Sequence, residues 1–316
     1  MRDLRIGTRG SPLARIQAEE VVRALKAHHL GTSFPVVVVR TGGDTARDAS
    51  LEELGRGIFT KELEEALLRG QVDLAVHSLK DLPARLPSGL TLAAVPPRLD
   101  ARDVVVSRDG KGLSKLSSGA RVGTSSPRRA ALVKALRRDL EAVPIRGNVD
   151  TRVRKVLTGQ YDAAILAAAG LLRLGLLQHI AEYLDPSLFV PEPGQGALGI
   201  EGREEDREAL EVARAIDHPP TRAAVTAERA FLEVMGGGCK VPLAAYGEVR
   251  DRWLWLVGLA ADPEGGRVMR APVTGPLEDP LEGGRRLAQA LLVPGAREMV
   301  AAARGRGCGA GCSGKS

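Results

Sequence analysis

The chain has 316 residues, of which 44% are hydrophobic, 27% charged and 3% aromatic, and its formal net charge is +6. This length predicts two or three domains, and no apolar run reaches the roughly 18 residues that span a membrane. The first ten residues, MRDLRIGTRG, contain no secretory hydrophobic region. Three cysteines are too few for a disulfide framework, so we expect a cytoplasmic protein and, by default, a monomer.

The positive charge comes from 45 basic against 39 acidic residues. Basic proteins often bind nucleic acid, but here both signs are mixed along the chain, stacking aromatics are scarce, and no nucleic-acid motif occurs. A small anionic substrate fits the basic surplus better than nucleic acid does.

Short apolar runs alternate with longer amphipathic patterns, which is typical of an α/β fold. In the first hundred residues the patterns predict strands at 4–7, 34–40, 72–79 and 91–95, and helices at 12–27 and 59–70. The strand at 34–40, FPVVVVR, is predicted to be buried. The prolines at 96 and 97 mark a first boundary.

A second unit begins near Asp103. Its predicted strands cover 103–107, 121–123, 142–145 and 161–169, and its helices 127–139 and 149–157. After a Pro/Gly-rich crossover at 190–203 come helices at 204–216 and 221–234, separated by a break at 217–220, then a strand at 253–260 and a helix at 284–292. The predicted domains are 1–96 plus 197–216, 97–196, and 217–303, followed by a disordered tail at 304–316.

One sequence pattern occurs in both of the first two units. IGTRGSP (6–12) and VGTSSP (122–127) each read as strand, Gly-Thr, polar turn and Ser-Pro at a helix start. Serine as N-cap and proline in the first turn favour a helix N-terminus there, and free N–H groups at that end attract anions. Two such ends facing a shared cleft would hold an anion; alternatively, both are ordinary caps.

Arginines lie next to both helix starts and at the turns that follow strands. Guanidinium groups bind carboxylates and phosphates through paired hydrogen bonds, and ligand sites in α/β folds lie beyond the carboxyl ends of strands. The candidates for anion binding are Arg9, Arg128, Arg129, Arg146, Arg152 and Arg173.

VHSLKDLP (76–83) ends a strand with Lys80 and Asp81 side by side. This pair is either a simple surface ion pair or a site where the carboxylate handles a proton or stabilises a cation. Asp44 in TGGDT is a second acidic candidate.

The third distinctive stretch is GGGCKVP (236–242), which contains Cys239. A structural cysteine normally packs inside a helix or strand, whereas three preceding glycines leave this thiol little cover. Cys308 and Cys312 form a CxxxC pair without a second ligand pair, so no metal site is predicted.

Eight collinear motifs resemble those of the porphobilinogen deaminase family, also called hydroxymethylbilane synthases. They cover more than 230 residues and are GTRGSPLA (7–14), RTGGD (40–44), GIFTKELE (57–64), VHSLKDLP, GTSSPRR (123–129), RGNVDTR (146–152), PEPGQGALGIE (191–201) and ERAFLEVMGGGCKVP (228–242). The resemblance implies three α/β domains, the first two similar to type II periplasmic binding protein lobes, with chain crossings near 96–103 and 190–200.

The resemblance also implies a cofactor and a reaction. Cys239 would carry a dipyrromethane through a thioether bond, with its carboxylates held by Lys80, Ser126, Arg128, Arg129 and Arg173. Arg9, Ser11, Arg146 and Arg152 would bind the incoming porphobilinogen and assist its deamination. Asp81 would stabilise the azafulvene cation and the pyrrole N–H groups. Four porphobilinogens would condense head to tail with loss of ammonia, and hydrolysis would release the linear tetrapyrrole of porphyrin and heme biosynthesis.

The sequence departs from the family pattern in LEELGRGIF (51–59), where Arg56 replaces a frequent lysine in the expected lid. A competing class remains, namely a two-lobed protein that binds small anions without catalysis. The missing signal peptide argues against a periplasmic version, and the glycine-flanked Cys239 has no use in such a protein. Ehrlich's reagent distinguishes the two, because it colours a pyrrole adduct and not a plain binder.

Overall fold

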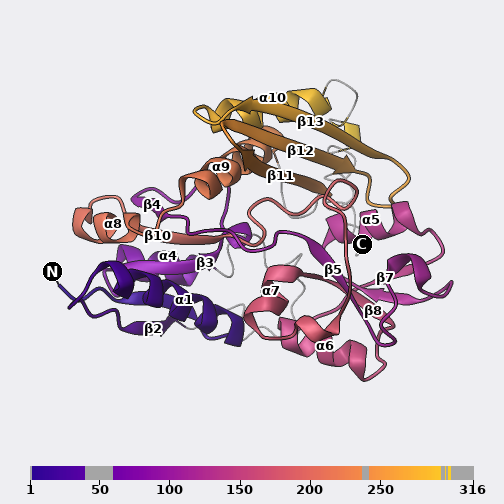
Figure 1. Cartoon of the computed structure of the whole chain (residues 1–316), viewed down its shortest axis with the longest axis horizontal. Coiled ribbons are helices and arrows are strands. Elements are labelled where there is room, and N and C mark those ends of the chain that lie inside the picture. Colours follow the sequence, from indigo (N-terminus) through magenta and orange to yellow (C-terminus); the bar gives the residue numbers. More distant parts are fainter. Residues whose placement is uncertain (1, 40–59, 237–241, 293–295, 297, 300–316) are drawn as a thin grey trace, which may run out of the picture. The chain divides into compact units, whose positions relative to one another are not determined.

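A computed structural model describes residues 2–39, 60–236, 242–292, 296, 298 and 299. Helices and strands alternate along these residues (Figure 1), so the predicted α/β class is confirmed. The chain divides into two compact units, described separately below. Unit 1 is Met1–Ala101, Ala167–Leu177 and Gly194–Val225, and unit 2 is Arg102–Leu166, Gln178–Pro193 and Thr226–Ser316. The three-domain boundaries expected from the sequence stay a prediction.

Unit 1 contains a five-stranded sheet in the order β2-β1-β3-β10-β4. The strands are β1 (Ile6–Arg9), β2 (Val36–Val39), β3 (Leu74–Ser78), β4 (Leu90–Ala94) and β10 (Leu198–Arg203). β1 is parallel to β2 and β3, and β10 is antiparallel to β3 and β4. The helices of this unit are α1 (Pro12–His28), α4 (Lys61–Leu68), α7 (Ala168–Arg173) and α8 (Arg207–Arg214), and the 3₁₀ turn η1 (Leu79–Asp81) follows β3.

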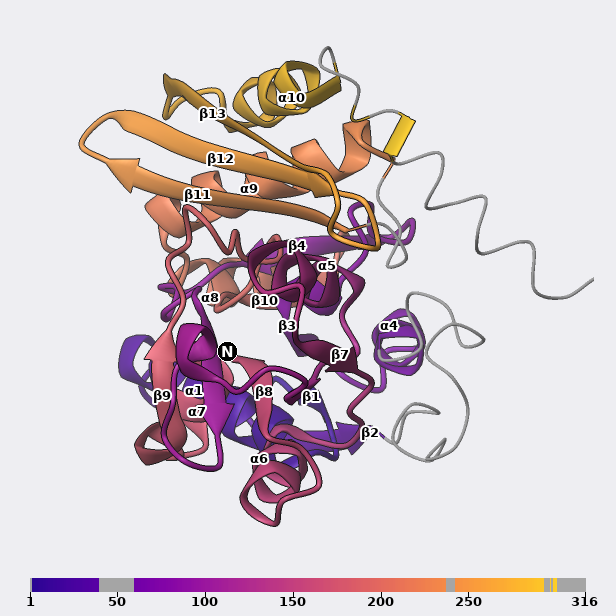
Figure 2. The same ribbon diagram turned by 90° about the vertical axis from the view of Figure 1, so that its right-hand side faces the viewer.

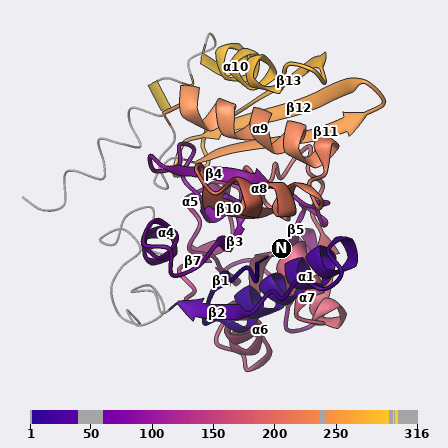
Figure 3. The ribbon, with the colours of Figure 1, turned by 90° about the vertical axis from the view of Figure 1, so that its left-hand side faces the viewer.

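The core of unit 1 forms because its helices have one apolar stripe each. In α1, Ala18, Val21, Val22 and Leu25 recur at helical spacing and are all buried. They pack with residues of β1, β3, β10 and α8 in one cluster, and α1 lies along the sheet in Figure 3. Leu63 and Leu67 of α4 pack in a second cluster with Val72, Ala75 and Leu90.

The sheet of unit 2 has the order β7-β6-β8-β5-β9. Its strands are β5 (Asp103–Ser107), β6 (Arg121–Gly123), β7 (Glu141–Val143), β8 (Ala163–Ala167) and β9 (Ile180–Tyr183). β6 is parallel to β7 and β8, and β5 is antiparallel to β9. α5 (Pro127–Leu136) follows β6 and α6 (Val149–Leu157) follows β7; the 3₁₀ turns are η2 (Leu113–Lys115) and η3 (Leu177–His179).

The two five-stranded sheets share one arrangement. In each, three parallel strands are followed by the first strand after the chain passes from one sheet to the other, β10 in the first sheet and β5 in the second. The chain leaves the first sheet between β4 and β5 and returns between β9 and β10. These are the two crossings that the family resemblance implied.

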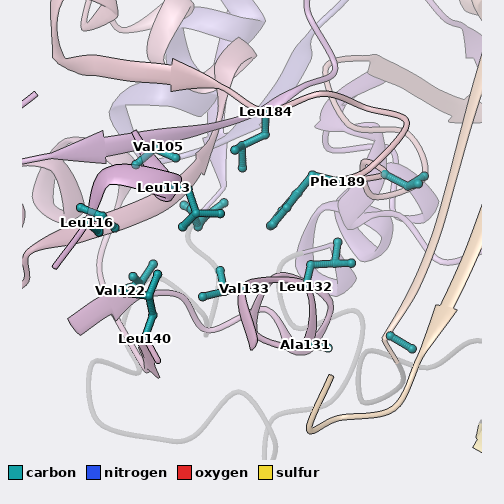
Figure 4. Close-up of a cluster of buried hydrophobic side chains, with 14 of the residues drawn as sticks. Val105, Leu113, Leu116, Val122, Ala131, Leu132, Val133, Leu140, Leu184 and Phe189 are labelled. Atoms are coloured by element: carbon teal, nitrogen blue, oxygen red, sulfur yellow. The ribbon is translucent and has the colours of Figure 1, made fainter. Parts of the chain in front are cut away.

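Unit 2 also contains an antiparallel sheet of β11 (Leu243–Arg250), β12 (Trp253–Ala261) and β13 (Val268–Pro276). Helix α10 (Pro280–Leu291) covers this sheet (Figure 2), and a Cβ at Gly258 would meet the Leu287 side chain at 3.0 Å. Helix α9 (Pro219–Val234) precedes the sheet. The cluster in Figure 4 joins Leu132 and Val133 of α5 to Phe189, and it also includes Leu259 of β12.

One sequence-based prediction about these elements was wrong. FPVVVVR was expected to be buried, but β2 is the edge of its sheet, and the side chains of Val36 and Val38 are 41% and 39% exposed. The break expected at 217–220 does separate two helices, but α9 begins two residues earlier than predicted, at Pro219. Proline fits the first turn of a helix because its missing N–H would be unpaired there anyway.

Candidate functional site

The two repeated Gly-Thr…Ser-Pro motifs form the same kind of helix start. Ser11 is the N-cap of α1, and its hydroxyl accepts a hydrogen bond from the Ala14 backbone N–H at 3.3 Å. Ser126 is the N-cap of α5 and accepts from the Arg129 backbone N–H at 3.4 Å. Both serines have extended backbone and precede a proline, as the sequence predicted.

The Gly-Thr pairs before these serines also have matching roles. A Cβ at Gly7 would meet Val72 at 3.0 Å, and one at Gly123 would meet Ile145 at 2.9 Å. Both positions therefore allow close packing against the neighbouring segment. Thr8 and Thr124 are both buried.

In unit 1 the predicted site residues gather at one edge of the sheet. β1 and β3 are parallel neighbours, so their carboxyl ends share that edge. Arg9 ends β1, and Lys80 and Asp81 lie in η1 directly after β3. The turn is anchored by buried Leu79 and leaves Asp81 exposed. An exposed carboxylate at this edge is accessible to a substrate.

Lys80 is held by a residue that sequence reasoning treated only as part of a crossover. Its ammonium group donates to Gln195 Oε1 at 3.3 Å. Gln195 is fully buried and donates to the Ala101 carbonyl at 2.8 Å. Its neighbour Gly194 has φ +77°, and a Cβ there would meet the Lys80 backbone nitrogen at 3.0 Å. The Gly-Gln-Gly spacing was the available signal, since glycine is needed for this close approach.

Arg173, predicted to bind a carboxylate of the cofactor, contacts a carboxylate of the protein itself. It ends α7, and its side chain is 5% exposed. Its Nε donates to Glu20 Oε2 at 2.8 Å and its Nη2 to Glu20 Oε1 at 3.4 Å. This bidentate pair joins α7 to α1, and sequence reasoning did not identify Glu20.

In unit 2, Arg128 and Arg129 lie in the first turn of α5 and are both buried. Both guanidinium groups donate to Asp103, which begins β5 and is 0% exposed. Arg128 also donates to the Val190 carbonyl and Arg129 to the Ile165 carbonyl. Two cations therefore share one carboxylate, and Asp103 is a further residue that sequence reasoning did not assign to the site.

Arg146 lies in the turn between β7 and α6, Arg152 lies in the first turn of α6, and β7 is parallel to β6. Arg146 is exposed, and its carbonyl accepts from the Lys155 ammonium at 3.1 Å. The Nε of Arg152 donates to the Gly147 carbonyl at 2.7 Å. Since β6 and β7 end at the same edge, these arginines and the start of α5 belong to one side of the unit 2 sheet.

A buried acidic group is formed by residues of β3, β10 and α4 in unit 1. His77 of β3 places Nε2 3.1 Å from Oε2 of Glu201 in β10, and both side chains are almost completely buried. Glu64 of α4 is also buried. Burial raises the pKa of Glu64, and the nearby negative charge of Glu201 adds to this rise, against a hydrogen bond with Thr60. The apolar and polar pattern of the sequence around His77 did not predict that this side chain would contact Glu201.

Cys239, Asp44, Arg56, Cys308, Cys312 and the tail at 304–316 lie outside the described residues. Within the described ranges no group of three His, Cys, Asp or Glu side chains is arranged to hold a metal ion. No helix in those ranges is long and apolar enough to cross a bilayer.

Comparison with known families identifies this arrangement. Residues 4–211 match the model of the porphobilinogen deaminase dipyrromethane cofactor binding domain, and residues 222–293 match the C-terminal domain of the same enzyme. The chain belongs to the porphobilinogen deaminase family. This family is one of enzymes, so the sequence-based expectation of an enzyme is confirmed at that level.

Individual relatives of this family match over almost their full length. A porphobilinogen deaminase of Desulforudis audaxviator is 48% identical over 96% of this chain and 98% of its own. One of Moorella thermoacetica is 47% identical over 95% and 96%. Among solved structures, the VFT2 domain of BvgS from Bordetella pertussis is 16% identical with a TM-score of 0.42, over 67% of this chain and 85% of that one.

The residues of unit 2 fit the cofactor for which the matched porphobilinogen deaminase domain is named. Arg128 and Arg129 carry two positive charges, and Asp103 carries one negative charge. In addition, Nε and Nη2 of Arg128 are buried and have no hydrogen-bond partner among the described residues. Buried donors without partners are costly, and a carboxylate of a bound ligand would satisfy them. The arrangement therefore fits a dipyrromethane, whose side chains carry carboxylates.

Proposed function

We propose that this chain condenses four porphobilinogen molecules head to tail and releases the linear tetrapyrrole hydroxymethylbilane. In each step one carbon–carbon bond forms between an aminomethyl carbon and the free α-carbon of the preceding pyrrole. One ammonia leaves the aminomethyl carbon, and the attacking pyrrole loses the proton from its α-carbon. The observation that carries this proposal is the match of both family domains, in order, over nearly the whole chain.

Asp81 is the residue that we propose to stabilise the cation. Loss of ammonia makes the aminomethyl carbon electron-poor, and attack by a pyrrole creates a second transient positive charge. A fixed carboxylate lowers the energy of both species. The exposure of Asp81 and its place after β3 support this role, because the group is held by η1 and is still accessible.

The dipyrromethane, when bound through Cys239, supplies the terminal pyrrole to which the first substrate is joined. We propose that its carboxylates are bound by Lys80, Ser126, Arg128, Arg129 and Arg173. The buried donors of Arg128 support this assignment most directly. For Arg173 to bind a cofactor carboxylate, its guanidinium must either bind that carboxylate and Glu20 together or release Glu20.

We propose that Arg9, Ser11, Arg146 and Arg152 bind the carboxylates of the incoming porphobilinogen and assist its deamination. Arg9 and Ser11 lie at the start of α1, where the helix N-terminus attracts anions. Arg146 and Arg152 lie at the corresponding edge of the second sheet. Hydrolysis then releases the tetrapyrrole and leaves the cofactor on the protein.

We also propose the enzyme class, the location and the oligomeric state. The reaction makes the protein a transferase. The scarcity of cysteine supports a cytoplasmic location, and a monomer that binds no nucleic acid remains the expectation.

Intact mass spectrometry of the purified protein tests this function. We expect an adduct equal to two condensed pyrrole units, located on Cys239 by peptide mapping. Cys239→Ala should keep the fold, lose the adduct and lose activity. Cys308→Ala is the matched control, because it removes another cysteine of a Gly-rich stretch and should leave both unchanged. An unmodified mass in fully active protein would contradict the proposal, and a protein that Ehrlich's reagent does not colour would favour the non-catalytic binder.

A further inference from the structure

In unit 2, the single carboxylate of Asp103 forms ion pairs with both Arg128 and Arg129. Arg128, Arg129 and Asp103 are 3%, 6% and 0% exposed. Charges are rarely buried unless they are paired, because removal from water is costly. The two arginines carry two positive charges and Asp103 carries one negative charge, so these three residues together have a net charge of +1.

The two arginines differ in their hydrogen bonds. All three guanidinium nitrogens of Arg129 donate, with Nε and Nη2 3.0 and 2.7 Å from Asp103 Oδ1 and Nη1 3.0 Å from the Ile165 carbonyl. This arrangement fixes Arg129 between β5 and β8. Arg129 is thereby held mainly by the protein itself.

Among the described residues, Arg128 makes its hydrogen bonds through one nitrogen. Its Nη1 donates at 2.7 Å to Asp103 Oδ2 and at 2.7 Å to the Val190 carbonyl. The Phe189 ring lies 5.9 Å from its guanidinium carbon. Nε and Nη2 have no hydrogen-bond partner among the described residues, and these two N–H groups form the side edge with which arginine binds a carboxylate in bidentate fashion.

We propose that Asp103 is a positioning residue for cofactor assembly. By occupying Nη1 of Arg128 and two nitrogens of Arg129, it turns the Nε/Nη2 edge of Arg128 toward one ligand carboxylate. Its charge offsets the repulsion between the two buried guanidinium groups, which is strong at low dielectric, and leaves one net positive charge for that carboxylate. This inference rests on the proposed function, since the ligand is the dipyrromethane on Cys239.

A purely structural ion pair is the alternative, and unit 1 offers a matched control. Asp73 is also a buried carboxylate that pairs with more than one arginine, with Arg5 at 3.0 Å, Arg203 at 3.2 Å and Arg2 at 3.9 Å. None of these four residues has a proposed role in binding. Asp73→Asn and Asp103→Asn therefore remove the same kind of group, but only the second change affects the arginines of the site.

The experiment measures how fast apo protein acquires its cofactor. Each variant is produced in cells that lack porphobilinogen, incubated with porphobilinogen, and followed by intact mass for the gain of two pyrrole units. Circular dichroism melts give the folded fraction to which each rate is normalised. Loading joins the Cys239 sulfur to the aminomethyl carbon of one porphobilinogen and the free α-carbon of that pyrrole to a second, with one ammonia lost at each bond. The gain in mass is measured on the protein itself and does not require a loaded enzyme that releases product.

We expect Asp103→Asn to load at least about tenfold more slowly than wild type, because charge-assisted hydrogen bonds of Arg128 are misdirected. Asp103→Glu keeps the charge and should load at an intermediate rate. Asp73→Asn should load within about twofold of wild type, although its melting temperature falls. Should Asp103→Asn not fold, Asp103→Glu decides, because a folded Asp103→Glu that loads at the wild-type rate overturns the inference.

Other outcomes separate a failure of the positioning role from a failure of the proposed function. Wild-type loading by folded Asp103→Asn, or equal slowing by Asp73→Asn, overturns the positioning role and leaves the proposed function intact. If wild-type apo protein gains no adduct at all, the proposed function fails, and the inference fails with it.

Discussion

The two five-stranded sheets share a strand order and a helix start, yet they place their charged groups differently. At the edge of the first sheet, the carboxylate of Asp81 is exposed after β3. At the edge of the second, the guanidinium groups of Arg128 and Arg129 are buried around Asp103. The difference suits the two tasks that we propose for these groups. A group that stabilises successive substrates has to be accessible, whereas groups that retain one ligand bind it more strongly away from water.

The largest effect is expected from Asp81→Asn, which keeps the size of the side chain and removes its charge. Loss of preorganised charge stabilisation should reduce turnover by ~100- to 1000-fold, or roughly 3–4 kcal/mol. Asp81→Glu should fall between this variant and wild type, because the charge survives but is displaced. Steady-state turnover of the three forms, with thermal melts as a control for folding, checks this prediction.

An exposed ion pair with Lys80 alone would contribute only about 0–1 kcal/mol. A folded Asp81→Asn protein that keeps more than about a third of wild-type turnover would therefore remove Asp81 from the mechanism.

The arginines test the other side of the comparison. Arg128→Leu should yield largely apo protein, because a charge-assisted hydrogen bond to a ligand carboxylate contributes about 1.5–3 kcal/mol. Arg146→Leu and Arg152→Leu should keep the cofactor and lose substrate binding and deamination. Intact mass gives the occupancy and stopped-flow release of ammonia gives the deamination step. Full occupancy in Arg128→Leu would contradict the division of roles between buried and exposed arginines.

The helix starts allow a smaller and more symmetrical test. Ser11→Ala and Ser126→Ala should each reduce the free energy of unfolding by about 1 kcal/mol, since each serine caps its helix. Beyond this shared loss, Ser126→Ala should lower cofactor occupancy and Ser11→Ala should raise the KM for porphobilinogen. Asp at either position retains the capping hydrogen bond and serves as the control for stability. If neither variant changes binding, the two motifs are ordinary caps.

The smallest effect concerns the buried Glu64. Its pKa is raised by burial above the value that it has in the unfolded chain, so the folded state favours its protonated form. This contribution to stability is complete below pH ~4.5 and is lost as pH rises through the folded pKa. Glu64→Gln should therefore raise the melting temperature at pH 7–8 by at most a few degrees and change it little near pH 4. Equal shifts at both pH values would contradict this explanation.

The sequence by itself determined the features that depend on local interactions. Both helix starts at Pro12 and Pro127 were predicted correctly, because capping involves only neighbouring residues. The α/β class and the order of the predicted elements followed from alternating patterns, and the family resemblance implied the two chain crossings. The roles of the individual site residues remain predictions.

The partners of the charged groups were decided only by the tertiary structure. Arg128 lies 25 residues from Asp103, and Arg173 lies 153 residues from Glu20. Neither pairing has a periodic or capping signal, because it depends on which strands and helices become neighbours. The exposure of β2 has the same origin: four consecutive valines are compatible with a buried strand, and only its place at the edge of the sheet leaves Val36 and Val38 in contact with water.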